Sequence, residues 1–168
     1  MKYRCHYQMP IGMICVEEED GAVTGLYMEE AATEDDHETE LLKQVHTQLI
    51  EYFNHRRHSF DLPVRLEGTD FQKQVWKALQ DIPYGKTCSY GELAGMIKRP
   101  NAARAVGGAN HNNPVLIIVP CHRVIGANGD LVGFGAGLGV KEFLLKLEQE
   151  ESGRQREDCP QNMKRDTK

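Results

Sequence analysis

The sequence lacks several features that would restrict its class. No apolar run approaches the roughly 20 residues that a helix needs to cross a bilayer, so we expect no membrane association. The first ten residues have no apolar core, which excludes a secretory signal, and we expect a cytoplasmic protein. Cysteine is scarce and odd in number, with five residues and no Cys-x-x-Cys pair. Neither a disulfide framework nor a zinc site is therefore expected, and a metal bound by Cys5, His6 and scattered histidines is the minor alternative.

The chain also lacks the basic net charge that is common among nucleic-acid-binding proteins. Its net charge is −5, but the charge is unevenly distributed. Residues 1–67 contain 6 basic and 14 acidic side chains, whereas residues 68–148 contain 9 basic and 6 acidic ones. Phosphate binding depends on the local field rather than the total charge. A nucleic-acid-binding surface is therefore compatible with the second part, although strong non-specific DNA affinity is not expected.

The first 67 residues predict a small sheet followed by a helix. Short segments rich in Tyr, Val, Ile and Met predict strands at residues 3–8, 12–17 and 22–28. Asp20–Gly21 is a hairpin turn signal. Between about residues 38 and 55, apolar side chains recur at the helical period. Residues 56–68, which include Pro63 and Gly68, predict a linker.

Capping signals predict three helices in the second part. Thr69 is an N-cap candidate for a helix that begins near Asp70. Ser89 and Glu92 form a capping box that opens a short helix to about Ile97. Asn101 is expected to cap the next helix, from Ala102 to about His111. Two short helices joined by a tight turn indicate a helix-turn-helix.

The remaining segments predict a buried strand, a hairpin, a last helix and a tail. The β-branched run Val115–Val119 is typical of a buried strand, and Asn128–Gly129 is a second turn signal. An amphipathic helix is expected from Leu138 to Glu150, with apolar residues facing inward at Phe143, Leu144 and Leu147. Residues 151–168 are almost without apolar residues and predict a disordered tail.

Cys121 is the candidate nucleophile, because it follows the predicted strand and a proline and precedes His122. A thiol must become a thiolate to attack carbon, so it needs a neighbouring base or positive charge. Glu148 on the last helix could orient His122 in a Cys-His-Glu relay. Most isolated cysteines are buried and inert, so this pair alone does not decide between the two interpretations.

A longer motif extends this pattern. The segment from Asn113 to Val124, NPVLIIVPCHRV, resembles the active-site segment of the O6-alkylguanine-DNA alkyltransferase family. The resemblance extends through SYGELA at residues 89–94, AARAVGGA at residues 102–109 and KEFLL at residues 141–145. It covers about residues 68–148 in the same order. It implies an α/β (α+β) fold with a small N-terminal sheet-plus-helix lobe and a mostly helical C-terminal lobe that contains the helix-turn-helix.

The resemblance implies roles for individual residues. Cys121 is the alkyl acceptor, His122 its base acting through a water, Glu148 the orienting acid and Asn113 a hinge residue that joins the recognition helix to the active-site loop. The DNA-binding residues are the arginine that fills the gap left by a flipped base, a tyrosine against the phosphate and small residues on the recognition helix: Arg104, Tyr90, Ala103, Gly107 and Gly108. The base pocket is lined by Val124, Phe134 and Gly135. Many family members have tyrosine where Phe134 stands, which puts the transfer rate in question.

The implied activity is DNA repair by an enzyme that works once, as a methylated-DNA–protein-cysteine methyltransferase. The alkyl group of O6-alkylguanine in double-stranded DNA passes irreversibly to Cys121 after base flipping, and O4-alkylthymine is a second candidate substrate. No cofactor and no metal are expected, and the protein is expected to be a monomer. The predicted organisation is an N-terminal lobe at residues 1–67, a DNA-binding and acceptor domain at 68–150 and the tail.

Three other functions fit the sequence less well. A damage-binding relative without repair activity would lack the acceptor cysteine, which is present here. A thiol hydrolase would use Cys121 and His122 but has no need of a glycine-rich helix. A transcription factor would carry polar side chains that read bases on its second helix, whereas residues 102–109 are mostly alanine and glycine.

Overall fold

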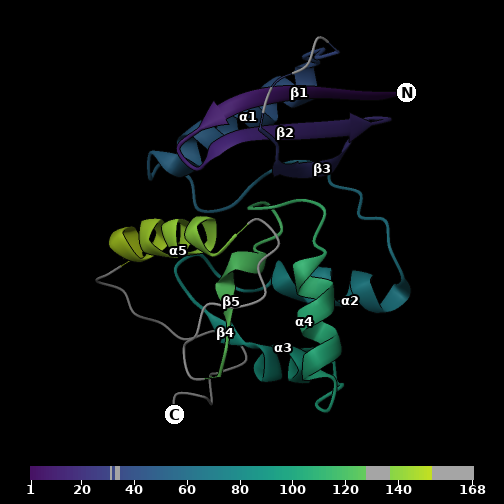
Figure 1. The fold of residues 1–168 in the computed structure, drawn as a ribbon, viewed down its shortest axis with the longest axis vertical. Coiled ribbons are helices and arrows are strands. Elements are labelled where there is room, and N and C mark those ends of the chain that lie inside the picture. The colour runs from purple at the N-terminus through teal and green to yellow at the C-terminus, as the bar shows by residue number, and fades with distance from the viewer. Residues whose placement is uncertain (31, 33–34, 128–136, 153–168) are drawn as a thin grey trace. The chain divides into compact units, whose positions relative to one another are not determined.

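The computed structural model describes residues 1–30, 32, 35–127 and 137–152. The chain forms two compact units (Figure 1). Unit 1 comprises residues 1–67 together with residues 114–118, and unit 2 comprises residues 68–113 and those from 119 onwards. Unit 1 is a sheet with a helix and unit 2 is mostly helical, so the predicted fold class is confirmed.

Unit 1 is built on a three-stranded antiparallel sheet. Strands β1 (Lys2–Met9), β2 (Gly12–Glu19) and β3 (Ala22–Met28) are adjacent in chain order. The predicted hairpin turn is confirmed, because Asp20 and Gly21 have φ angles of 51° and 81°. Positive φ at both central residues gives the turn a twist that suits the flanking strands.

Helix α1 (Glu40–Phe53) packs against this sheet (Figure 1). Thr39 is its N-cap, and the Thr39 side chain accepts a hydrogen bond of 3.1 Å from the Leu42 backbone N–H. Leu42, Val45 and Leu49 are fully buried at the spacing of one helical face. The predicted helix is therefore confirmed, and its apolar stripe forms the core of unit 1.

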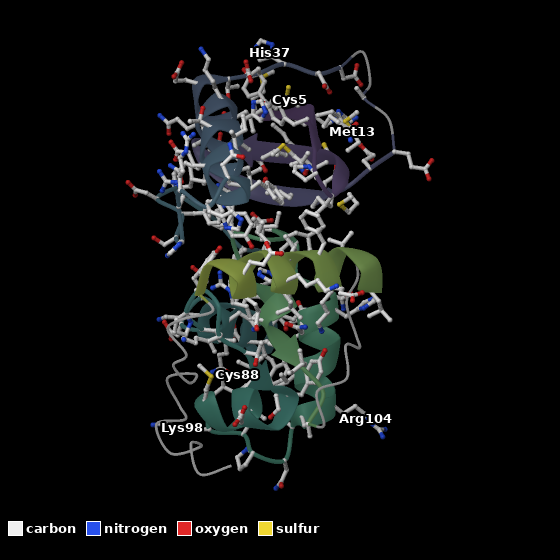
Figure 2. All side chains as sticks on the ribbon, turned by 90° about the vertical axis from the view of Figure 1, so that its left-hand side faces the viewer. Cys5, Met13, His37, Cys88, Lys98 and Arg104 are labelled. Carbon is white, nitrogen blue, oxygen red and sulfur yellow. The ribbon has the colours of Figure 1, made fainter. Side chains whose placement is uncertain are left out.

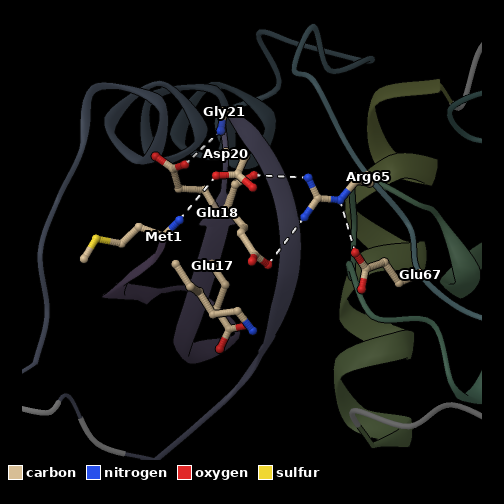
Figure 3. Close-up of polar contacts among 9 residues, drawn as sticks. Met1, Glu17, Glu18, Asp20, Gly21, Arg65 and Glu67 are labelled. Atoms are coloured by element: carbon tan, nitrogen blue, oxygen red, sulfur yellow. Dashed lines mark hydrogen bonds and ion pairs between the residues drawn. The ribbon is translucent and has the colours of Figure 1, made fainter.

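The predicted linker at residues 56–68 is in part attached to the sheet. Val64 forms a parallel bridge with Val23, and the Val23 N–H donates a hydrogen bond of 2.8 Å to Pro63 O. Arg65 lies between two carboxylates, with Nη2 3.4 Å from Glu19 Oε1 and Nε 3.2 Å from Glu67 Oε2 (Figure 3). The segment thus pairs with the free edge of β3 instead of running as an unattached connection.

The predicted strand at Val115–Val119 is wrong. Only Val115 makes a bridge, with Leu26 of β3, and residues 116–118 form a turn in which Ile117 has a φ of 69°. A β-branched residue rarely adopts positive φ, so this backbone is strained. The run is apolar because it is buried, not because it is extended. Residues 114–118 also differ from the predicted division of the chain, since they pack in unit 1.

Unit 2 contains the helix-turn-helix. Helix α2 (Asp70–Leu79) begins with a capping box at Thr69, and α3 (Tyr90–Met96) begins with the predicted box of Ser89 and Glu92. Both predicted N-caps are confirmed. Helix α4 (Ala103–His111) differs from the prediction, because its N-cap is Ala102, which makes no side-chain cap hydrogen bond, and not Asn101. Helices α2, α3 and α4 contact one another and form the helical core of the unit.

The last elements surround the segment after Pro120. A short 3₁₀ helix, η1 (Cys121–Arg123), leads into β5 (Val124–Ile125), which pairs in parallel with β4 (Cys88–Ser89). Helix α5 (Leu138–Ser152) extends two residues beyond the predicted end. Residues 151 and 152, which were predicted to begin the tail, therefore belong to α5. The predicted turn at Asn128–Gly129 and the rest of the predicted tail, residues 153–168, lie outside the described residues.

The buried face of α5 differs from the prediction. Leu144 and Leu147 are buried as expected, but Phe143 is 40% exposed. Lys141 and Glu148 are instead almost fully buried on the same face as Leu144, at helical spacing. In the part of the chain that the structure describes, no helix combines the length and the apolar character required to cross a membrane.

Candidate active site

Cys121 is the first residue of η1 and is held rigidly by its backbone. Its N–H donates a hydrogen bond of 2.8 Å to Val119 O, and its carbonyl accepts one of 3.3 Å from Asn110 Nδ2. The residue is only 1% exposed. Pro120 cannot donate a backbone hydrogen bond and fixes the φ angle just before the thiol. The thiol is therefore presented from a short, fixed turn between a proline and a histidine.

Burial raises the pKa of the Cys121 thiol to about 11. The Asn113 side chain, which is hydrogen-bonded to the thiol, and the charge of Lys141 both oppose this increase. Burial disfavours the thiolate because a charged group loses its hydration in the protein interior. The resting form is therefore the protonated thiol, and a base is needed to produce the nucleophile.

His122 belongs to a buried cluster with Glu148 and Arg123. His122 Nε2 lies 2.6 Å from Glu148 Oε2. The Arg123 guanidinium donates two hydrogen bonds of 2.9 Å to Glu148, from Nε to Oε1 and from Nη2 to Oε2. Glu148 Oε1 also accepts a hydrogen bond of 3.2 Å from the Gly85 N–H. Such a bidentate pair combines fixed geometry with charge-assisted hydrogen bonds.

This cluster fixes the protonation state of His122. Burial lowers the pKa of His122, although the neighbouring Glu148 opposes the decrease. Burial alone would raise the pKa of Glu148, but His122 and Arg123 lower it well below its usual range. Glu148 is thus ionised and accepts the Nε2–H of a neutral imidazole. Nδ1 of His122 is then an acceptor, and it has no hydrogen-bond partner among the described residues.

These pKa shifts predict that acid destabilises the protein. Both pKa values are lower in the folded state, so the stabilising contributions exist above the usual values near 6.5 and 4.5 and decrease as the pH falls through them. We expect the urea midpoint to decrease between pH about 7.5 and about 4. Other groups titrate in this range, so the His122→Gln variant is the matched comparison. A variant with the same pH dependence as the wild type between about 7.5 and 5.5 would contradict the assignment for His122.

Lys141 is a site residue that the sequence interpretation missed. It is fully buried on α5, and its Nζ lies 5.9 Å from the centroid of the Tyr90 ring. Burial lowers the pKa of Lys141 to about 8, while the electrostatic interaction with Cys121 acts in the opposite direction. A lysine charge near the thiol favours the thiolate once it forms. The available signal was the helical period, which puts Lys141 on the same face as Leu144.

Asparagine side chains join α4 to the segment that bears the thiol. Asn113 Nδ2 donates a hydrogen bond of 2.8 Å to Val119 O, in addition to its contact with the Cys121 thiol. Asn110 contacts the Tyr90 side chain as well as the Cys121 carbonyl. The structure therefore brings Asn113, Tyr90 and Cys121 together. Asn110, like Arg123, was not singled out from the sequence because its role depends on contacts between separate elements.

The exposed side of α4 carries the other predicted residues. Arg104 is exposed and projects outward from the helix (Figure 2). Gly108 is also exposed, and a Cβ added there would have no heavy atom within 4 Å. A Cβ on Gly107 would make an ordinary contact of 3.8 Å with the Tyr90 ring. Packing within the chain thus requires neither glycine, and with Ala103 half-buried the helix presents a surface with little side-chain bulk.

Of the three residues predicted to line the base pocket, the structure describes one. Val124 is fully buried in β5 directly after η1. Phe134 and Gly135 lie outside the described residues. Among the described residues, the group with donor atoms close enough to bind a metal is in unit 1, with none of its members at the Cys121 site.

Both units of the chain are similar to proteins of one known family. Two family models match the chain: the ribonuclease-like domain of 6-O-methylguanine DNA methyltransferase over residues 2–66 and its DNA-binding domain over residues 70–150. A methylated-DNA–protein-cysteine methyltransferase of Methanosarcina acetivorans is 58% identical over 109 residues, covering 65% of this chain and 70% of the relative. One from Mycolicibacterium paratuberculosis is 46% identical over 148 residues, covering 85% and 90%. The crystal structure of Mycobacterium tuberculosis OGT in complex with DNA has a TM-score of 0.82 at 45% identity, covering 89% and 94%.

Proposed function

Because the chain belongs to the 6-O-methylguanine DNA methyltransferase family, we propose that it repairs O6-alkylguanine in double-stranded DNA by transferring the alkyl group to its own Cys121. The observation that supports this role most directly is the buried thiol of Cys121, followed in the chain by a neutral His122 whose Nδ1 has no partner among the described residues. Glu148 holds the other ring nitrogen. This arrangement provides a nucleophile, a base and a residue that orients the base.

The first step removes the proton from the thiol. The thiol has a pKa of about 11, so His122 Nδ1 accepts its proton, directly or through one water molecule. The resulting imidazolium lies beside ionised Glu148, which stabilises it. The thiolate that forms is stabilised by the positive charge of Lys141 and by the Asn113 side chain.

The second step is a displacement at saturated carbon. The thiolate sulfur forms a bond to the alkyl carbon, the bond from that carbon to guanine O6 breaks, and the electron pair of that bond remains on guanine. Guanine leaves as its anion becomes protonated or hydrogen-bonded, which lowers the barrier. The product is a thioether, which has no simple hydrolytic route back to the thiol. We therefore infer one transfer for each protein molecule, and the same chemistry applies to O4-alkylthymine.

Access to the alkyl carbon requires a flipped base, since guanine O6 lies within the base stack. Flipping costs a few kcal/mol, and a side chain that fills the vacated space offsets part of this cost. Arg104 is exposed on α4 and long enough to enter the duplex in this way. Tyr90 at the start of α3 is the candidate contact to the neighbouring phosphate. The low-bulk surface around Gly107 and Gly108 lets α4 approach a shallow groove closely.

Gly108 gives a prediction in which stability and DNA binding change in opposite directions. Gly108→Ala adds a methyl group in open space, so we expect the helix to be stabilised by about 0.5–1 kcal/mol. The same methyl group prevents the closest approach of DNA, so we expect affinity for duplex DNA to fall by about tenfold or more. Urea denaturation and fluorescence anisotropy measure the two effects.

Gly139→Ala is the matched control for this change. Gly139 is in α5, outside the helix-turn-helix, and a Cβ added there also has no neighbour within 4 Å. We expect this variant to bind DNA like the wild type. Unchanged DNA affinity in Gly108→Ala would show that this surface does not approach DNA.

Intact-protein mass spectrometry tests the proposed function. The protein is incubated with a duplex oligonucleotide that contains one O6-methylguanine, and we expect each molecule to gain one methyl group in place of a hydrogen. The gain should stop at one equivalent when the DNA is in excess, and peptide mapping should locate it on Cys121. Continued demethylation without a change in protein mass would instead indicate a hydrolytic enzyme. Binding without any mass change would indicate a damage-binding protein.

The finer points of the proposal concern assembly and location. We propose that the protein acts as a monomer in the cytoplasm and that it prefers alkylated over undamaged duplexes. Preference for damage follows because the Cys121 site binds a flipped alkylated base. The acidic residues of unit 1 disfavour non-specific DNA binding.

A further inference from the structure

A buried asparagine connects two groups that border the Cys121 thiol. Asn110 lies in the last turn of α4 and is 1% exposed. Its Nδ2 donates a hydrogen bond of 3.3 Å to the Cys121 carbonyl, and its side chain is also hydrogen-bonded to the Tyr90 hydroxyl. A carbonyl oxygen can only accept, so the NH2 group of the Asn110 amide must face Cys121. The contact with Cys121 therefore fixes the orientation of the whole amide.

The hydrogen bond between Asn110 and Tyr90 has a defined direction. Burial raises the pKa of Tyr90, and the hydrogen bond with Asn110 opposes this increase. A hydrogen bond that lowers the pKa of a phenol is one donated to its oxygen, because such a bond favours the charged form. Asn110 is thus the donor and Tyr90 Oη the acceptor.

The carbonyl oxygen of the same amide has no hydrogen-bond partner among the described residues. A buried acceptor without a partner lowers stability, and a leucine of similar size would avoid this cost. Packing alone therefore does not favour asparagine at position 110. We assign the residue to the two hydrogen bonds that its NH2 group donates, because unpaired buried polar atoms are uncommon and require a specific reason.

Other contacts fix the ring of Tyr90 but not its hydroxyl hydrogen. A Cβ added to Gly107 would lie 3.8 Å from the ring, so the ring packs against α4 one turn before Asn110. Lys141 Nζ lies 5.9 Å from the ring centroid. The hydrogen of a hydroxyl can still rotate to suit its surroundings. A donor that occupies one side of the Tyr90 oxygen directs this hydrogen to the other side.

The Tyr90 hydroxyl is close enough to the acceptor thiol for an electrostatic interaction with Cys121. The alkyl carbon of a bound guanine must lie against the Cys121 sulfur, so the nucleotide that carries it lies beside Tyr90. As the bond to guanine O6 breaks, negative charge develops on the base. A hydrogen-bond donor that is fixed in advance stabilises such charge.

We propose that Asn110 is a positioning residue for alkyl transfer, which holds the Tyr90 hydroxyl with its hydrogen directed at the bound nucleotide. Asn110 itself does not touch the reacting atoms and acts through Tyr90. Its hydrogen bond to the Cys121 carbonyl keeps the amide in the orientation that this role requires. The role rests on the proposed function and adds to it a residue that supports the leaving of guanine.

A double-mutant cycle tests this role. Single-turnover transfer from a duplex that contains one O6-methylguanine is measured for Asn110→Leu, Tyr90→Phe and the double variant. Tyr90→Phe removes the donor and should slow transfer by about 10²-fold, and Asn110→Leu should slow it by about 10-fold or more. In the double variant, the loss of Asn110 should add less than about threefold to the effect of Tyr90→Phe, because the hydroxyl on which it acts is absent. The affinity of Asn110→Leu for the duplex should change by less than about threefold, since the effect is on the transition state.

NMR reports the same hydrogen bond without any transfer. Tyrosine is labelled with ¹³C at the ring carbon that bears the hydroxyl, and the Tyr90 signal is identified by its absence in Tyr90→Phe. We expect this signal to move in Asn110→Leu. Asn112→Leu is the matched control, because Asn112 is an exposed asparagine at the end of the same helix, and it should leave both the signal and the transfer rate unchanged. Asn110→Ala is measured as well, so that a poor fit of leucine does not decide the result, and circular dichroism checks each fold.

The proposal is wrong if the effects of Asn110→Leu and Tyr90→Phe on the rate multiply, or if the Tyr90 signal does not move. Asn110 would then only support the backbone at Cys121. A wild-type protein that transfers no methyl group would overturn the proposed function and this role together. Transfer by the wild type with independent effects of the two changes would overturn the role of Asn110 alone.

Discussion

We expect Cys121→Ser to abolish alkyl transfer completely while the variant still binds duplex DNA that contains O6-methylguanine. A serine hydroxyl has a much higher pKa than a thiol and is a far weaker nucleophile without a strong base. The neutral His122, which suffices for a thiol with a pKa of about 11, is too weak a base for an alcohol in the same buried position. Binding is retained because the change preserves size and leaves α4 untouched. Intact mass and fluorescence anisotropy measure the two results.

Cys5→Ser is the control for this experiment. Cys5 is a more exposed free thiol in unit 1, and its replacement should leave both the transfer and its stoichiometry unchanged. A methyl group on any residue of Cys121→Ser would mean that another side chain is the acceptor. Loss of DNA binding by this variant, with its fold intact by circular dichroism, would mean that the thiol contributes to recognition as well as to chemistry.

Glu148→Gln should strongly destabilise unit 2. Glu148 is 1% exposed and is hydrogen-bonded to both Arg123 and His122. Glutamine removes the negative charge and leaves the buried Arg123 guanidinium without a counter-ion, which costs about 3–5 kcal/mol. The same change leaves His122 without the carboxylate that stabilises its protonated form, so transfer should slow by about 10²-fold to 10⁴-fold. Urea denaturation and single-turnover kinetics measure the two effects.

Glu142→Gln, on the same helix, is the matched control. Its carboxylate is exposed and pairs with Lys146 at 3.6 Å, so its loss should change stability by less than about 1 kcal/mol. Transfer should proceed at the wild-type rate. If Glu148→Gln were as stable as this control, another group would have to neutralise the Arg123 charge. The proposed role of Glu148 as the counter-ion of Arg123 would then be wrong.

The elements that the sequence predicted correctly are those with local causes. The hairpin at Asp20–Gly21 and the N-caps at Thr69 and Ser89 depend on residues within a few positions of one another. The family resemblance identified the candidate acceptor Cys121 from the motif around it. These features need no knowledge of distant contacts.

The features that the sequence did not predict depend on contacts between distant segments. The run Val115–Val119 is apolar because it is buried, and periodicity alone cannot distinguish a buried strand from a buried turn. Lys141 is fully buried on α5, whereas Phe143, which the hydrophobic pattern placed inward, is 40% exposed. An apolar pattern cannot identify a charged residue at a buried position.

The pairing of Leu26 with residues 114–116 has a consequence for how the protein is made. Leu26 donates a hydrogen bond to Pro114 O and accepts one from the Leu116 N–H, at 2.9 and 3.0 Å. During synthesis, β3 therefore remains without part of its edge partner until the 46 residues of unit 2 at 68–113, and then residues 114–116, have left the ribosome. An unpaired strand edge is a site of aggregation, and slow translation between residues 67 and 118 would prolong its exposure. The chain is thus most vulnerable to misfolding during the period when unit 1 has been synthesised without residues 114–116.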